Sequence, residues 1–411
     1  SGTAGSAATP PNASPIDSGQ TSTPGALPAA SISGNSATSS DSDSFEVDRA
    51  QNQRETSTAP EKGSPRWLVL QMTQLRMKPF PETDDIEKQR ESRRVRNQEI
   101  ITLATEAIAR THEDKEQEAV FNVAVHRLMD ATMELALQGD QESVDALFGH
   151  ADSLYQRDPK SRAAAEAAWF VARFANTNAR RFADQDIRWL QEFSRQTRTF
   201  ADRFPEEQQR AVGLLSDAGA SCDYHGLREE AILCFETLKQ NYPDTPQAEQ
   251  AIPALRRLNL IGKPLDLGGP TLDGGFISVA DFKGSPVLVV FWSTQASPFI
   301  EQADSIIVAA AKYESQGLQV LGVNLDIDET AIDAFLEKSR MGWRTIFHTD
   351  ADRRGWKHPI AVYYGVTGIP QIWLVDAAGK VVSTTIAARD LDATLVRLLP
   401  AARPVTATTP R

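Results

Sequence analysis

Two cysteines and six histidines are the side chains of this sequence best suited to redox, nucleophilic or metal chemistry. Two thiols, Cys222 and Cys234, are too few for a disulfide framework, and their spacing is not that of a zinc site. The histidines are isolated, with no His-x-x-x-His pair that would place two imidazoles on one helix face. We therefore predict no metal ion and no other cofactor.

The surroundings of the two cysteines leave two interpretations open. Cys222 and Cys234 fall in two neighbouring predicted helices. A cysteine in such a position is most often a small, buried hydrophobic side chain. In an oxidising compartment the pair could instead form a disulfide across the two helices, provided that their Cα atoms lie within about 7 Å.

Residues 65–256 carry the apolar periodicity of helices. Segments such as "NQEIITLATEAIAR", "EAVFNVAVHRLMDATMELAL" and "SRAAAEAAWFVARFA" repeat apolar side chains at intervals of three and four residues. Breaks are predicted before Pro159, Pro205 and Pro243, because proline cannot continue a helix. The sequence thus predicts an all-α region with several consecutive helices.

The clearest unit of this region is "LLSDAGASCDYHGLREEAILCFETLKQNYPDTPQAEQA". It resembles a tetratricopeptide repeat of the kind found in bacterial envelope proteins. The matching positions are Leu215, Gly219, Gly226, Ala231, Phe235 and Pro243. The resemblance implies antiparallel helix pairs that stack on their neighbours. An irregular helical bundle is the alternative.

Beyond Asn259 the pattern changes to one of strands and helices. Residues 286–292, "PVLVVFW", are a continuous apolar run of the type that is buried on both faces of a sheet. Further strands are predicted in "LQVLGVNLD", "QIWLVD" and "KVVSTTI", and helices over 297–313, over 329–339 and in "RDLDATLVRLL". This order predicts an α/β sheet with helices on both faces.

Two ordered motifs of this region carry a resemblance to a known family. "IGKPLDLGGPTLDGGFISVADFKGSPVLVVFWSTQASPF" resembles the opening of extracytoplasmic thioredoxins of the TlpA/ResA type and of redoxins, and "YYGVTGIPQIWLVDAAGKVV" resembles their second hallmark. The match covers about a third of the chain. It implies a thioredoxin-like fold over residues 257–400 and, for the family, thiol-disulfide or peroxide reduction.

The sequence departs from this family at the positions that do the chemistry. In the family two cysteines follow the strand, and a helix N-terminus lowers the pKa of the first. Here Ala296 and Phe299 stand in their places, and Gln302 replaces a common acidic residue. The peroxiredoxin register points to Ser297, whose alcohol would need an adjacent base. We assign Ser297 instead to the helix N-cap, followed by Pro298.

The family resemblance also implies a binding groove. In the family the bond corresponding to Ile369-Pro370 is cis, and the backbone before it pairs with an extended substrate. With the cysteines gone, Trp292, Ala296, Phe299, Ile369 and Pro370 would line an apolar groove that binds a peptide by strand addition. A relic without a ligand is the alternative.

The two ends of the chain are predicted to lack a core. Residues 1–64 are nearly all Ser, Thr, Ala, Gly, Pro and Asn at first, so they bury too little apolar surface to order. They resemble the stalk of bacterial lipoproteins, which implies an extracytoplasmic protein, in the periplasm or anchored to the envelope by an N-terminal lipid. A plain linker or an expression scar is the alternative. We expect that any signal sequence has been removed and that residues 401–411 are flexible.

The composition argues against two features, nucleic-acid binding and a membrane span. The net charge of −12 argues against a nucleic-acid partner, and no apolar run approaches the roughly 18 residues of a membrane span. We predict a redox-inactive envelope protein that binds a protein or peptide as a scaffold, and therefore no enzyme. The alternative is an oxidoreductase or redoxin of the TlpA/AhpC-TSA type whose chemistry rests on Cys222 and Cys234. A small-ligand binder between the two folded modules is a third hypothesis.

Overall fold

The chain is described by a computed structural model that covers residues 59–80, 82–339 and 341–398. Residues 1–58 of the predicted tail (1–64) and the predicted flexible end at 401–411 lie outside the described residues. The chain divides into two compact units, Ser1–Cys222 and Asp223–Arg411. The change from helices to strands falls near the predicted position of 256/257, but the last helix pair belongs to the second unit.

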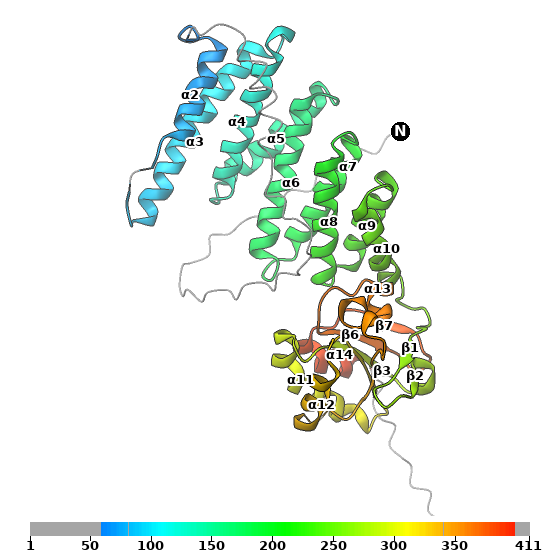
Figure 1. The fold of residues 1–411 in the computed structure, drawn as a ribbon. Coiled ribbons are helices and arrows are strands. Elements are labelled where there is room, and N and C mark those ends of the chain that lie inside the picture. Colours follow the sequence, from blue (N-terminus) through cyan, green and yellow to red (C-terminus); the bar gives the residue numbers. More distant parts are fainter. Residues whose placement is uncertain (1–58, 81, 340, 399–411) are drawn as a thin grey trace, which may run out of the picture. The chain divides into compact units, whose positions relative to one another are not determined.

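The first unit is entirely helical in its described part, as predicted (Figure 1). Its helices are α2 (Pro65–Met77), α3 (Ile86–Thr111), α4 (Glu118–Ala136), α5 (Gln141–Arg157), α6 (Arg162–Phe182), α7 (Arg188–Arg203) and, up to Cys222, α8 (Gln208–Tyr224). Each of α3 to α6 packs against the next helix along the chain. The assignment to tetratricopeptide repeats stays a prediction.

The predicted proline breaks are confirmed. Helices α5 and α7 end at C-cap residues Asp158 and Phe204, and α9 (Arg228–Asn241) ends at Tyr242. Each C-cap residue directly precedes a proline, which disfavours the helical conformation of the residue before it. The following α6 and α10 (Pro246–Leu258) begin at N-cap side chains, Ser161 and Thr245, which accept backbone N–H bonds.

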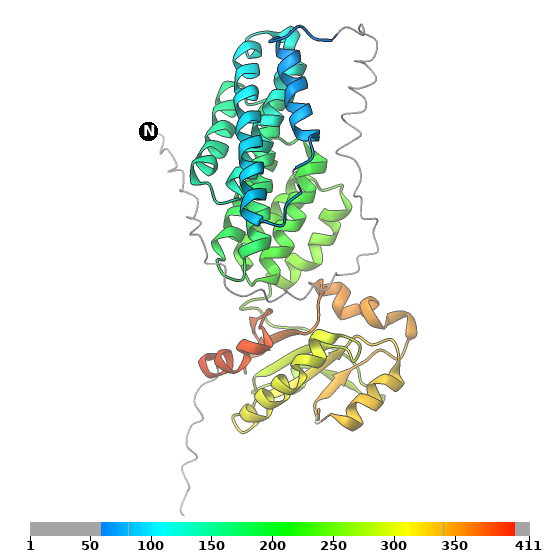
Figure 2. The same ribbon diagram turned by 90° about the vertical axis from the view of Figure 1, so that its left-hand side faces the viewer.

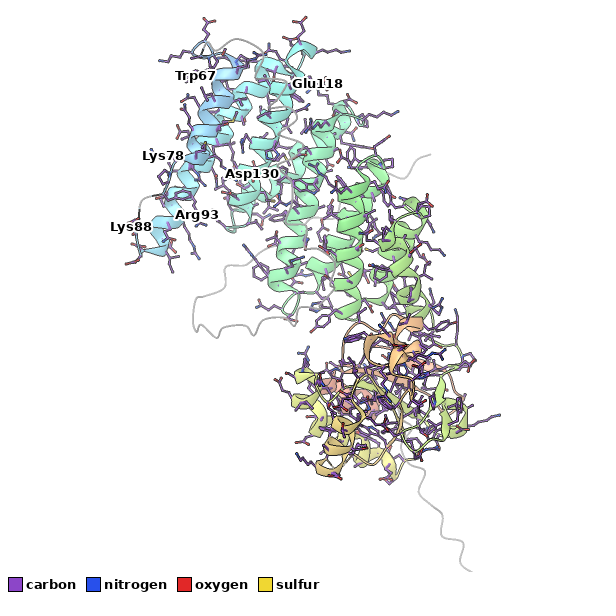
Figure 3. The ribbon with its side chains drawn as sticks, in the orientation of Figure 1. Trp67, Lys78, Lys88, Arg93, Glu118 and Asp130 are labelled. Atoms are coloured by element: carbon purple, nitrogen blue, oxygen red, sulfur yellow. The ribbon has the colours of Figure 1, made fainter. Side chains whose placement is uncertain are left out.

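An ion-pair network joins the first three described helices. Arg76, at the end of α2, pairs with Asp130 and Glu134 of α4, and Asp130 is labelled in Figure 3. Asn97 of α3 donates its amide to Glu134 Oε2 over 2.8 Å. Burial opposes the ionisation of Glu134, but the bonds from Asn97 and Arg76 outweigh it and lower its pKa.

The second unit contains a five-stranded sheet (Figures 1 and 2). After α9 and α10 its elements are β1 (Gly268–Pro270), β2 (Phe276–Ser278), β3 (Val287–Trp292), α11 (Ser297–Glu314), β4 (Gln319–Asn324), α12 (Glu329–Lys338), β5 (Arg344–Ile346), α13 (Pro359–Tyr364), β6 (Gln371–Val375), β7 (Val381–Ser383) and α14 (Leu391–Leu398). The strand order is β5-β4-β3-β6-β7, with β3, β4 and β5 parallel and β6 and β7 antiparallel to their neighbours. This is the thioredoxin-like α/β fold that the sequence predicted.

The central strand β3 is buried on both faces, as its apolar run predicted. Leu288, Val290 and Trp292 point into a core shared with α11, α12 and α14. The alternate residues, such as Val289 and Phe291, point into a second core shared with β2 and α13. Helices therefore cover both faces of the sheet.

Helix α10 contacts the sheet part of the second unit at the end of α13. Arg257, only 2% exposed, donates its Nε to the carbonyl of Tyr364 over 3.1 Å and pairs through its Nη1 with Asp223 over 3.0 Å. Gly365, the left-handed C-cap of α13 at φ 62°, lies so close to α10 that an added Cβ would be 2.8 Å from Ala254 N. These contacts explain why α10 belongs to the second compact unit.

No helix among the described residues is both long enough and apolar enough to cross a membrane.

Candidate functional site

The site is the turn between β3 and α11, where the sequence places the degenerate residues. The carbonyl of Ala296 accepts bonds from the N–H groups of Phe299 (2.9 Å) and Ile300 (3.0 Å), so Ala296 is the N-cap, without a side-chain cap bond. Ser297 is the first helical residue, and Pro298 follows it. The prediction that Ser297 is the N-cap is therefore wrong by one residue, because the helical ladder already starts at the Ala296 carbonyl.

A buried carboxylate holds this turn. Asp326, two residues after β4 and 2% exposed, accepts the Ser293 hydroxyl at 2.6 Å and the Thr294 hydroxyl at 2.9 Å. Its oxygens also accept the Thr294 backbone N–H (2.9 Å) and the Asn324 side-chain amide (2.7 Å). The carboxylate is thus satisfied by hydrogen bonds that come from the turn and from its own strand end. Sequence reasoning missed Asp326, although a polar Asn-x-Asp at the end of an apolar strand was a visible signal.

The structure corrects two of the five groove residues. Trp292 and Phe299 are both 0% exposed, and their ring centroids lie 5.4 Å apart. Both rings also pack against Phe335 of α12, at centroid distances of 5.8 and 6.1 Å. Side chains buried in the core do not line an open groove, so this part of the prediction is wrong. The partly buried Ile369 and Pro370 do reach the surface.

Of the four degenerate positions, Phe299 is therefore a core residue. Ala296 and Gln302 are partly buried, and Ser297 is exposed. The other side chains of the turn are the amide of Gln295 and the hydroxyls of Ser293 and Thr294, which donate to Asp326.

The bond between Ile369 and Pro370 is cis, as the family resemblance implied. Pro370 directly precedes β6, whose first residue, Gln371, pairs with Phe291 near the end of β3. The cis bond and the turn after β3 therefore lie at the same edge of the sheet. Of the five predicted groove residues, Ala296, Ile369 and Pro370 remain partly accessible there.

The two cysteines are remote from this edge in sequence and lie in helices of different compact units, Cys222 in α8 and Cys234 in α9. Both are 0% exposed. The disulfide that we considered between them stays a prediction. The Cys222 Sγ lies 3.8 Å from the carbonyl oxygen of Leu190 in α7.

Two histidines lie close together beside the sheet. His358 is the N-cap of α13 and only 1% exposed, and its Nδ1 accepts the N–H of Ile360 at 3.2 Å. The ring of His348, which follows β5, stands edge-on to it at a centroid distance of 5.8 Å. Burial, aided by repulsion from His348, lowers the pKa of His358 to about 4. Within the described part of the chain, no three His, Cys, Asp or Glu side chains form a group that could hold a metal ion.

This pKa makes stability depend on pH. In the unfolded chain His358 binds a proton near pH 6.5, whereas in the folded chain it does so only near pH 4. The free energy of unfolding is therefore highest above pH 6.5 and falls by about 3 kcal/mol, from this group, as the pH drops from 6.5 to 4. We expect His358→Asn, which keeps a capping acceptor, to flatten urea-unfolding free energies across that range. His112→Asn, at an exposed position, is the control. An unchanged slope in His358→Asn would contradict the assignment.

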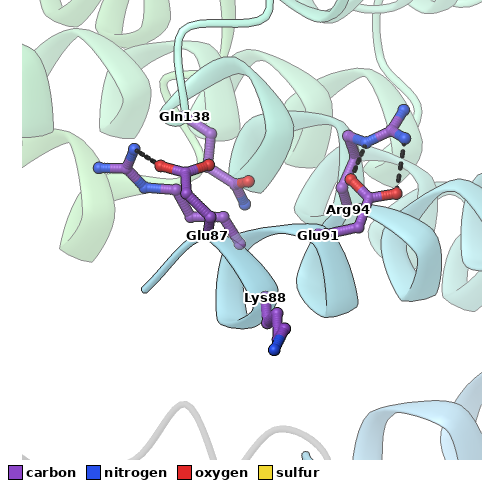
Figure 4. Close-up of a pocket in the computed structure, with 6 residues that line it drawn as sticks. Glu87, Lys88, Glu91, Arg94 and Gln138 are labelled. Atoms are coloured by element: carbon purple, nitrogen blue, oxygen red, sulfur yellow. Dashed lines mark hydrogen bonds and ion pairs between the residues drawn. The ribbon is translucent and has the colours of Figure 1, made fainter. Parts of the chain in front are cut away.

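Two surface hollows lie away from the turn. One, of about 420 Å³, is lined by Glu87, Lys88, Arg90, Glu91, Arg94 and Gln138 (Figure 4). Its charges are already paired along α3, Arg90 with Glu87 at 3.0 Å and Arg94 with Glu91 at 2.7 Å. The other hollow is lined by the region of β7 and α14, including Ile386. Neither contains a residue of the turn or the cis bond.

Comparison with known proteins finds similarity in the sheet region. The AhpC/TSA family matches residues 261–384. A ResA thiol-disulfide oxidoreductase from Bacillus thuringiensis is 28% identical over 111 residues, which are 27% of this chain and 60% of the relative. The chloroplastic peroxiredoxin Q of Gentiana triflora is 30% identical over 112 residues, which are 26% of this chain and 50% of the relative. The chain thus spans at most about 60% of the length of these relatives.

Solved structures are similar over the same share of the chain. The thioredoxin domain of a thiol-disulfide oxidoreductase from Bacteroides vulgatus is 26% identical and covers 34% of this chain and 98% of its own, with a TM-score of 0.31. A thiol:disulfide interchange protein from Bacteroides sp. is 25% identical and covers 35% of this chain and 93% of its own, with a TM-score of 0.31.

Proposed function

We propose that residues 261–384, a thioredoxin-like domain of the AhpC/TSA family, carry out no dithiol chemistry and serve to bind a protein or peptide. The observation that carries this proposal is the start of α11, where Ala296 and Phe299 stand in place of two thiols. A methyl group and a benzyl group transfer no electrons. Phe299 is, in addition, part of the core.

The binding surface in this proposal is the sheet edge at the cis bond. Ile369 and Pro370 remain partly accessible there, and Ala296 begins the neighbouring helix. Exposed Ile300 adds apolar surface on the first turn of α11. An extended segment of a partner would lie along this edge by strand addition. The helical region would add a second binding surface, and the family resemblance favours a location outside the cytoplasm.

A bulky substitution tests this surface. We expect Ala296→Trp in the full chain to reduce binding of a reduced, carboxymethylated model polypeptide by at least about tenfold, because the bulky indole would obstruct this surface. A tenfold loss of affinity corresponds to about 1.4 kcal/mol of binding free energy. Fluorescence polarisation would measure the affinity. Val308→Trp, at a 67% exposed position further along α11, is the matched control. Equal binding by both variants, or no binding by the unmodified chain, would remove the peptide-binding proposal.

The alternative is an oxidoreductase that uses Cys222 and Cys234. The names of the relatives favour it, whereas the complete burial of both thiols opposes it. We expect neither thiol to react with Ellman's reagent in the folded chain and both to react in urea, because a buried thiol is inert. Fast labelling of the folded chain, or peroxide or disulfide turnover that is lost in Cys222→Ser or Cys234→Ser, would favour the alternative.

A further inference from the structure

Positive charge collects beside the ion-pair network that joins α2, α3 and α4. Arg76 contacts both carboxylates of this network, Asp130 and Glu134. The Nη2 of Arg96 lies 4.0 Å from Glu134 Oε2, so Arg96 shares a carboxylate that Arg76 already holds. The side chains of these four residues are 15 to 29% exposed, so the network is open to solvent.

Arg127 of α4 adds a guanidinium with no carboxylate of its own. Within the part of the chain that the structure describes it makes no ion pair, and its Nε is buried without a hydrogen-bond partner. Burial lowers the pKa of Arg127, while Asp130 raises it and Arg76 lowers it, so both of these charges lie near Arg127. The positive charge of Arg127 is therefore incompletely compensated.

Arg93 of α3 is the fourth arginine at this place and is labelled in Figure 3. Its guanidinium carbon lies 5.6 Å from the centroid of the Phe80 ring, and that of Arg96 lies 3.9 Å from the same centroid. Arg93 makes no ion pair with a described residue. The arginine cluster consists of Arg76, Arg93, Arg96 and Arg127. Its four positive charges face only two carboxylates.

The sequence of this chain contains a segment of complementary charge. Residues 41–48, "DSDSFEVD", carry four carboxylates and no basic side chain. We propose that this acidic segment binds to the arginine cluster and supplies the carboxylates that the cluster lacks. Two of its carboxylates would balance the excess of two positive charges. Because the cluster is partly buried, salt screens such pairs less than it screens fully exposed ones.

The chain is long enough for this contact. Asp48 is eleven residues from Ala59, where the described part begins, and eleven extended residues span up to about 36 Å. Shortly after Ala59, the carbonyl of Gly63 accepts a bond from Arg110, near the end of α3. Arg110 follows Arg96 by 14 residues, which is about 21 Å along the helix. The acidic segment can therefore turn back along α3 to the arginine cluster. This inference does not depend on the proposed function.

Distances between two spin labels in the full chain test the proposal. One label is attached at Ser44→Cys in the acidic segment and the other at Gln98→Cys, an exposed position of α3 two residues after Arg96. The native cysteines are 0% exposed and should not take up label. We expect pulsed dipolar spectroscopy at low salt to show a population with short, narrowly distributed separations. This population should fall about tenfold in roughly 0.5 M salt, where charges are screened within a few ångströms.

Neutralising the arginine cluster is the decisive comparison. We expect Arg93→Gln/Arg127→Gln to remove the short separations to the same extent as high salt. Arg90→Gln/Arg94→Gln is the matched control, because these two arginines of α3 are already paired with glutamates of the same helix. It should leave the separations unchanged. Replacing the four acidic residues of the segment by Asn and Gln should match the cluster variant, and it alters no residue of the described helices.

The proposal fails on any of three results. One is an unmodified labelled chain without short separations at low salt. Another is retention of the short separations when the four acidic residues are neutralised. The third is their loss when the labelled chain is mixed with an excess of unlabelled chain, which would place the segment on the arginine cluster of a second copy.

Discussion

Replacing Asp326 by alanine is expected to lower the free energy of unfolding of the second unit by about 3–5 kcal/mol, which makes it the most damaging single change at the candidate site. The carboxylate accepts bonds from Ser293, Thr294 and Asn324. Its removal leaves several buried donors without an acceptor, and each costs about 1–3 kcal/mol. Urea unfolding followed by the fluorescence of the buried tryptophans would measure the loss.

Two further variants sharpen this experiment. Asp326→Asn keeps the shape and one acceptor oxygen, so we expect a loss between those of the unmodified chain and Asp326→Ala. Asp328→Ala is the control, because Asp328 is an exposed N-cap whose Oδ1 accepts the Thr330 N–H at 3.0 Å. Loss of such a cap lowers the free energy of unfolding by about 1 kcal/mol. If Asp326→Ala were no worse than Asp328→Ala, the carboxylate would not be holding the turn.

Replacing Gly322 by alanine is the second change with a large expected effect, a destabilisation of about 1–3 kcal/mol. The new methyl group would lie within 3 Å of both Thr345 Oγ1 and Trp292 Nε1. Neither group belongs to a flexible chain end, because the indole is locked in the core and the hydroxyl sits on a strand. The midpoint of urea unfolding should fall with no change in its slope.

The matched control for this substitution is Gly342→Ala. A Cβ at Gly342 would meet nothing within 4 Å, so we expect its unfolding midpoint to stay near that of the unmodified chain. Similar midpoints for Gly322→Ala and Gly342→Ala would mean that the core around Trp292 rearranges to accept the methyl group. The close approach at Gly322 would then not lower the free energy of unfolding.

The strands and helix breaks could be predicted because their signals are local. The apolar run of β3 and the residues before Pro159, Pro205 and Pro243 need only their neighbours to be interpreted. Strand β5 and helix α13 were missed, since elements of three and six residues carry too little periodicity. The cis bond before Pro370 was predicted from the family resemblance and not from periodicity.

The site was predicted less well because its interactions span long distances in the sequence. Asp326 bonds to a residue 33 positions away, and no local pattern shows that pairing. The burial of Phe299 was open to prediction: it begins the stripe Phe299, Ala303, Ile306, Ala310 and Tyr313, whose three- and four-residue spacing marks the buried face of α11. The family resemblance led us to place Phe299 in a groove, although the periodicity of α11 already indicated that it is a core residue.

The attachment of α10 to α13 decides where the chain should be cut for recombinant work on the sheet domain alone. A fragment that starts at residue 257, where the sequence pattern changes, would lose Asp223 and the helix against which Gly365 packs. It would expose the surface of α13 that α10 covers and would leave the guanidinium of Arg257 without its carboxylate. A fragment that starts before Asp223 keeps both, so the shorter piece is an unsafe stand-in for the domain in partner screens.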